Sequence, residues 1–113
     1  MKKNETLSEY EEAVVLAQYL TLKGYKFSHI PAETFTKSWG VKMRNKRQGV
    51  NRGVPDYLIV KGNKLIFCEL KRTKGGVISE QQQSWINALN ECMGVVAFVA
   101  KGFEEAKKMI ESV

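Results

Sequence analysis

Two apolar runs separated by only two residues constrain the fold of this chain more than any other feature. Residues 56–61 and 64–71 are rich in β-branched and aromatic side chains, and Gly62-Asn63 lies between them. A two-residue link that begins with glycine is typical of a β-hairpin turn, which also fixes the register. Because both runs are apolar on both faces, we expect these two strands in the middle of a sheet.

The rest of the pattern predicts helices packed on that sheet. Apolar residues at helical spacing, an N-cap at Ser8 or Thr6 and a terminating Gly24 predict a helix over 8–23. The other expected elements are helices over 80–93 and 103–112, strands over 25–30 and 95–100, and a long loop over 32–53. We therefore predict an α/β fold in which helices flank a mixed central sheet, with residues 1–113 forming one domain.

Positive charge is concentrated in the middle of the chain. Residues 35–74 hold 11 of the 18 Lys and Arg residues but only 2 of the 12 Asp and Glu residues. Such a block is typical of a surface that faces a polyanion, and we interpret it as a nucleic-acid interface. Anionic lipid and acidic protein are alternatives on charge alone. Within the long loop, Trp39 and Phe35 are candidates either to stack on unpaired bases or to cover the core.

Three charged side chains are expected to converge at one end of the hairpin. The turn places Asp56 opposite Glu69, and Lys71 shares a strand face with Glu69. Two facing carboxylates repel each other, and a hard cation such as Mg²⁺, which takes one or two carboxylates plus waters, relieves that repulsion. This arrangement favours metal-assisted phosphodiester hydrolysis. A salt-bridged strand end without a metal is the alternative.

Short motifs around these residues run along nearly the whole chain. They are Gly53-Val54-Pro55-Asp56, Cys68-Glu69-Leu70-Lys71-Arg72, Ile78-Ser79 with Gln82 and Trp85, and the earlier stretches Tyr19-Leu20 to Gly24 and His29-Ile30-Pro31-Ala32-Glu33. In this order they resemble the VRR-NUC domain nucleases of the PD-(D/E)XK superfamily. The resemblance is to a minimal stand-alone form of the phage type, and it implies a restriction-endonuclease-like core.

The resemblance also implies a role for individual residues. The matching catalytic and metal-binding positions are Asp56, Glu69, Lys71 and Gln82, with Leu70 adding its backbone carbonyl as a metal ligand. A glutamate of the first helix is expected to join them, with Glu9 as the first choice and Glu12 as the second. Glu33 matches the family stretch only in part, because Ala32 stands where Asn is usual. The implied cofactor is Mg²⁺, with Mn²⁺ able to substitute.

We accordingly predict a Mg²⁺-dependent, structure-specific DNA endonuclease. The expected form is a homodimer that cuts four-way (Holliday) junctions, and Tyr10, Tyr19 and Tyr25 are candidates for its interface. A flap or nicking nuclease, or a catalytically silent DNA-binding module, is the alternative. The residues expected to contact the DNA backbone are Lys42, Arg44, Lys46, Arg47, Arg52, Arg72 and Lys74.

Location in the cell is the last expectation. No apolar run approaches the roughly 18 residues of a membrane span, and the N-terminus lacks the apolar segment of a secretory signal. We interpret Cys68 and Cys92 as two buried, reduced thiols. The sequence therefore predicts a cytoplasmic protein, in the host cytoplasm if it is phage-encoded, with no membrane partner and no small-molecule substrate.

Overall fold

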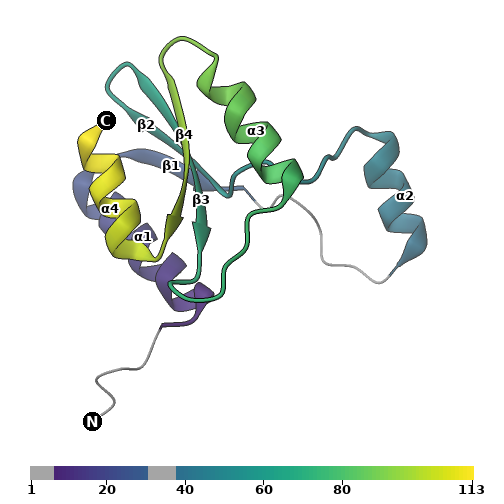
Figure 1. Cartoon of the computed structure of the whole chain (residues 1–113), viewed down its shortest axis with the longest axis horizontal. Helices are drawn as coiled ribbons and strands as arrows, with labels where there is room; N and C mark the ends of the chain where they lie inside the picture. The colour runs from purple at the N-terminus through teal and green to yellow at the C-terminus, as the bar shows by residue number, and fades with distance from the viewer. Residues whose placement is uncertain (1–6, 31–37) are drawn as a thin grey trace.

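A computed structural model describes residues 7–30 and 38–113 of the chain, as four helices and one four-stranded sheet (Figure 1). The elements in chain order are α1 (Glu9–Lys23), β1 (Lys26–His29), α2 (Trp39–Arg47), β2 (Tyr57–Lys61), β3 (Lys64–Lys71), α3 (Glu80–Asn90), β4 (Val95–Lys101) and α4 (Phe103–Ser112). The sheet order is β1-β2-β3-β4, so the predicted α/β architecture with a mixed central sheet is confirmed.

The β2–β3 hairpin has the register that its turn predicts. Lys61 pairs with Lys64 and Tyr57 pairs with Cys68. Gly62 at the turn has φ of +60°, a left-handed conformation that favours glycine. β1 runs antiparallel to β2, and β4 runs parallel to β3 after the α3 crossover, which leaves β2 and β3 in the centre as predicted. β2 begins at Tyr57, one residue later than the strand predicted over 56–61, so Asp56 lies just before it.

The two faces of β3 meet different helices. Ile66, Cys68 and Leu70 are buried in the main core, together with side chains of α1 and α4. Glu69 alternates with them and therefore projects to the opposite face, where α3 lies (Figure 1). The alternation of a strand thus places one acidic side chain, 4% exposed, under the start of α3.

A buried glutamate joins α1 to α4. Ser8 caps α1 in a capping box with Glu11, as predicted for one of the two candidate caps, and Thr6 lies outside the described residues. One turn on, Glu12 accepts hydrogen bonds from the backbone N–H of Phe103 at 2.9 Å and from the hydroxyl of Thr73 at 2.7 Å. Because α4 has no side-chain N-cap, Glu12 supplies the acceptor at its first turn.

The long loop predicted over 32–53 contains a helix, and that prediction was wrong. Ser38 accepts a hydrogen bond from the N–H of Val41 and caps α2, which stands apart from the sheet in Figure 1. No residue of α2 is buried. The apolar periodicity that reveals a core helix is therefore missing from its sequence.

Smaller differences concern boundaries and single side chains. The helix predicted over 80–93 ends at Asn90, and Cys92 beyond it is exposed, whereas Cys68 is buried as expected. Tyr19, a candidate for the dimer interface, donates a hydrogen bond to Glu111 and packs edge-on against Phe103, so its side chain makes contacts within its own chain. No helix in the described part of the chain is both long and apolar enough to span a membrane.

Candidate active site

Glu69 is the centre of the candidate site. Its Oε2 accepts a hydrogen bond from the Gln82 side-chain amide at 2.9 Å and lies 3.4 Å from the Lys71 ammonium. Its Oε1 is the one buried side-chain polar atom, among the described residues, that has no hydrogen-bond partner. Buried carboxylate oxygens are normally satisfied, so this atom is a vacant acceptor inside the protein.

Asp56 lies at the end of the sheet beside Glu69. Its Oδ2 accepts from the Leu70 backbone N–H at 3.4 Å, which ties the residue before β2 to the far end of β3. It also borders a groove of about 510 Å³ between α1 and the sheet. The predicted proximity of Asp56, Glu69 and Lys71 is therefore present, although Asp56 does not extend the β2 ladder.

Both carboxyl groups are driven toward their protonated forms. Burial, followed by the nearby charge of Asp56, raises the pKa of Glu69 to about 7, although Lys71 and the backbone N–H of Asp56 oppose part of the shift. Burial likewise raises the pKa of Asp56, and the Leu70 N–H partly opposes the change. Burial raises the pKa of both acids, and the charge of Asp56 adds to the shift at Glu69, so added positive charge stabilises the site.

Gln82 connects α3 to this site. Its side-chain oxygen accepts from the N–H of Ser79 in the capping box of α3, while its amide NH₂ donates to Glu69. The sequence interpretation expected Gln82 to orient Lys71 or water, and the structure places it on Glu69. The Gln82 side chain thus fixes the position of Glu69 relative to the first turn of α3.

The two glutamates proposed from the first helix lie in different surroundings. Glu9 is exposed and borders the same groove as Asp56, and its charge raises the pKa of Asp56. Glu12 is 5% exposed, and both of its oxygens are taken up by Phe103 and Thr73. Of the two, only Glu9 has a carboxylate near Asp56.

The expected DNA-contact residues fall in two places. Arg72 and Lys74 are exposed just after β3, beside the candidate site. The others lie on α2 and the segment that follows it, and they are Lys42, Arg44, Lys46, Arg47 and Arg52. Glu33 and Phe35 lie outside the described residues.

The donor set fits Mg²⁺ in part. In residues 7–30 and 38–113, no group of three His, Cys, Asp or Glu side chains is close enough to hold a metal ion. However, Mg²⁺ takes one or two carboxylates and keeps several waters, so it does not require such a group. The vacant Oε1 of Glu69, next to a second carboxylate with a raised pKa, suits a hard cation.

Comparison with known proteins identifies the family. Residues 2–104 match the family model of the VRR-NUC domain. The chain belongs to this family. A solved structure titled "VRR_NUC domain protein" matches with a TM-score of 0.76 at 24% identity, covering 96% of this chain and 88% of the other. A second, titled "VRR_NUC domain", has a TM-score of 0.65 at 18% identity and covers 91% and 94%. No curated protein matches the sequence.

Membership of the VRR-NUC family agrees with the predicted resemblance and with a nuclease-type fold of the PD-(D/E)XK superfamily. The structure gives a physical reason for one glycine of the motifs and adds a second glycine outside them. Gly53, with φ of +94°, lies so close to α3 that an added Cβ would be 2.6 Å from the Gln81 backbone carbon. Gly76 lies beside Lys71, where a Cβ would be 2.8 Å from that of the lysine. The sequence alone does not reveal why glycine is needed at either position, because the close approaches are tertiary contacts.

Proposed function

We propose that this VRR-NUC domain is a Mg²⁺-dependent DNA endonuclease whose active site is built on Asp56, Glu69 and Lys71. The observation that carries the proposal is Glu69: a buried carboxylate with one vacant oxygen, held by Gln82 and Lys71, beside a second, half-buried acid. An acid that serves only to stabilise the fold would have partners for both oxygens. Family membership supports phosphodiester hydrolysis as the chemistry that uses such a site.

Each residue then has a defined task. Asp56 and Glu69, with the Leu70 carbonyl and Glu9 on the open side, would hold the cation. When bound, Mg²⁺ would neutralise charge on the scissile phosphate and lower the pKa of the attacking water. The Lys71 ammonium orients that water and balances charge on the phosphate. Gln82 fixes the orientation of Glu69, which leaves Oε1 available. Attack from the side opposite the leaving oxygen inverts the configuration at phosphorus.

The basic residues support DNA as the substrate. The five cations from Lys42 to Arg52 are accompanied by no acidic residue between Ser38 and Pro55. Phosphate contacts of this kind give affinity without sequence preference and with a strong dependence on salt. Replacing Arg44, Lys46 and Arg47 together is expected to flatten the slope of log affinity against log salt by roughly 0.9 for each lost phosphate contact.

A branched substrate and a homodimer complete the proposal. One active site makes one incision, whereas resolving a four-way junction needs two on opposite strands, and a two-fold dimer supplies both. Tyr10, 77% exposed on α1, is available for such an interface, while Tyr19 is engaged within the chain. The expected dimer would have twice the 12.8 kDa of the chain.

The test is a parallel cleavage assay on a labelled four-way junction, a flap and a linear duplex, each with Mg²⁺ and with EDTA. We expect paired cuts in the junction with Mg²⁺ only, and light scattering is expected to show a dimer. A monomer that yields only nicked products would favour the flap or nicking nuclease. Binding without cleavage, unchanged by Glu69→Gln, would favour the silent DNA-binding module.

A further inference from the structure

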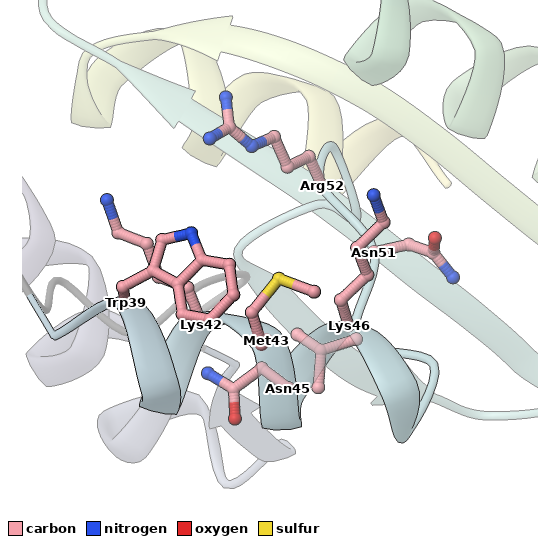
Figure 2. A pocket seen from close by; sticks show the side chains of 8 residues that line it. Trp39, Lys42, Met43, Asn45, Lys46, Asn51 and Arg52 are labelled. Carbon is pink, nitrogen blue, oxygen red and sulfur yellow. The ribbon is translucent and has the colours of Figure 1, made fainter.

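A second cavity lies away from the carboxylates, between α2 and the residues that follow it. Its volume is about 420 Å³, within the roughly 300–1,000 Å³ typical of small-ligand sites. Figure 2 shows Trp39, Met43 and Lys42 on the helix side and Arg52 across from them. We call this cavity the α2 cleft. None of its lining residues belongs to the carboxylate site.

Two of the apolar side chains of α2, Trp39 and Met43, line the cleft instead of the protein core. Trp39 and Met43 are four residues apart and therefore lie on one helix face. Trp39 is 74% exposed, and α2 buries none of its residues. A large indole left open to water, beside a hollow, is typical of a surface that a ligand covers.

The charges around this apolar floor are all positive. Lys42 and Lys46 share the helix face of Trp39, and Arg52 is on the opposite wall. Neither the cleft lining nor the chain from Ser38 to Pro55 contains a carboxylate. A flat aromatic surface with cations at its rim matches a nucleotide, because the base can stack on the indole while the phosphate lies among the cations.

The position of the cleft distinguishes nucleic acid from an anionic lipid surface. Arg52 is four residues before Asp56, so their Cα atoms are at most about 14 Å apart. Between them, Gly53 packs on the first turn of α3, which carries Gln82. Adjacent nucleotides along one strand of duplex DNA are about 3.4 Å apart along the axis. A nucleotide in the cleft would therefore lie only a few nucleotides along the strand from a phosphate at Asp56 and Glu69.

We infer that the α2 cleft binds one unpaired nucleotide of the DNA substrate, with its base on Trp39 and its phosphate between Lys42, Lys46 and Arg52. This inference rests on the proposed nuclease function. A base inside a duplex has both faces stacked on its neighbours, so only an unpaired or flipped base can enter a walled cleft. The cleft then selects branched DNA over uninterrupted duplex.

The test measures binding in EDTA, so that cleavage does not interfere. A fluorescent duplex carrying a single-stranded thymidine branch is compared with the same duplex without the branch. Trp39→Ala is expected to weaken binding of the branched DNA by about 5- to 150-fold, the range for loss of one stacked base. The unbranched duplex is expected to change by less than about twofold. Trp39→Phe is expected to restore part of the difference.

Charge variants provide the matched control. Arg44 and Arg47 are on the same helix but outside the cleft, so Arg44→Ala with Arg47→Ala removes two charges and is expected to weaken both DNAs alike. Lys42→Ala with Lys46→Ala removes the same charge from the cleft and is expected to weaken the branched DNA more. Quenching of tryptophan fluorescence by a thymidine oligonucleotide is expected to persist in Trp85→Phe and to disappear in Trp39→Phe.

The possible failures are distinguishable. If Trp39→Ala weakens both DNAs equally or neither, while the wild-type protein cuts DNA in Mg²⁺, the cleft inference is overturned and the nuclease proposal stands. If the branched DNA depends on Trp39 but no DNA is cut, the nuclease proposal fails and the nucleotide site survives. Binding to phosphatidylserine vesicles is measured in parallel. If Trp39→Ala weakens binding to these vesicles but not to DNA, the cleft is a lipid surface and the inference is overturned.

Discussion

Glu12 and Glu69 are both buried acids of one small fold, yet their surroundings differ in a way that separates structure from function. Glu12, between α1 and α4, has a donor for each oxygen, from Phe103 and Thr73. Glu69, between β3 and α3, has Gln82 and Lys71 at Oε2, faces a second acid, and has no hydrogen-bond partner at Oε1. Burial alone therefore does not identify an active-site acid. The unmet acceptor and the like-charged neighbour are the features on which the proposed active-site role of Glu69 rests.

Activity should show the largest difference between these two acids. Glu69→Gln keeps the size of the side chain but removes the charge, and we expect the Mg²⁺-dependent cleavage rate to fall more than about 100-fold, beyond the loss typical of partners outside the metal's own ligands. Glu12→Gln, assayed well below its melting temperature, is expected to keep the rate within about threefold. Single-turnover cleavage of a labelled junction measures both. Equal losses in the two variants would contradict the assignment.

The stability of the metal-free protein should depend on pH through Glu69. An ordinary glutamate has a pKa of 4.5, whereas burial and Asp56 raise that of Glu69 to about 7. Between these values the folded protein binds more protons than the unfolded chain, so the free energy of unfolding should fall as pH rises from 4.5 to 7. The loss is at most about 3 kcal/mol, at 1.36 kcal/mol per pKa unit.

Urea unfolding in EDTA at several pH values measures this effect. Glu69→Gln is expected to remove most of the slope, and the part that remains belongs to Asp56, whose pKa is also raised. A wild-type protein that gains stability across this interval would show that Glu69 is ionised and fully satisfied in the folded state.

For stability at pH 8 the order of the two variants should reverse, with Glu12→Gln more harmful than Glu69→Gln. Glu12→Gln leaves either Phe103 N–H or Thr73 with a poorer acceptor, and we expect the free energy of unfolding to fall by about 1–3 kcal/mol. Glu69→Gln removes a repelling charge and is expected to leave the stability of the metal-free protein unchanged or raised. Thermal unfolding followed by circular dichroism would measure both. A strongly destabilised Glu69→Gln would favour the salt-bridge interpretation.

How far the sequence predicts this structure depends on the range of the contacts. The β2–β3 register follows from the local turn at Gly62-Asn63, so the proximity of Glu69 to Lys71 and Asp56 was predictable. α2 was not, because a helix that buries nothing has no apolar period to read. The resemblance ranked Glu9 before Glu12, but no physical reason in the sequence separates the two. That reason depends on Phe103, 91 residues away from Glu12.

The smallest expected effect concerns Gln82, which both caps α3 and holds Glu69. Gln82→Glu separates the two tasks, since a carboxylate still accepts from Ser79 N–H but cannot donate to Glu69. We expect the cleavage rate to fall about 10- to 100-fold, the size typical of a residue that orients a metal ligand. The stability of the metal-free protein should also fall, because a second carboxylate then faces Glu69. Ser79→Ala is the converse control. It removes the cap oxygen and is expected to lower stability by about 1 kcal/mol while leaving the rate unchanged. If instead Ser79→Ala slows cleavage as much as Gln82→Glu does, Gln82 acts only by holding the helix, and Oε2 of Glu69 needs no donor for catalysis.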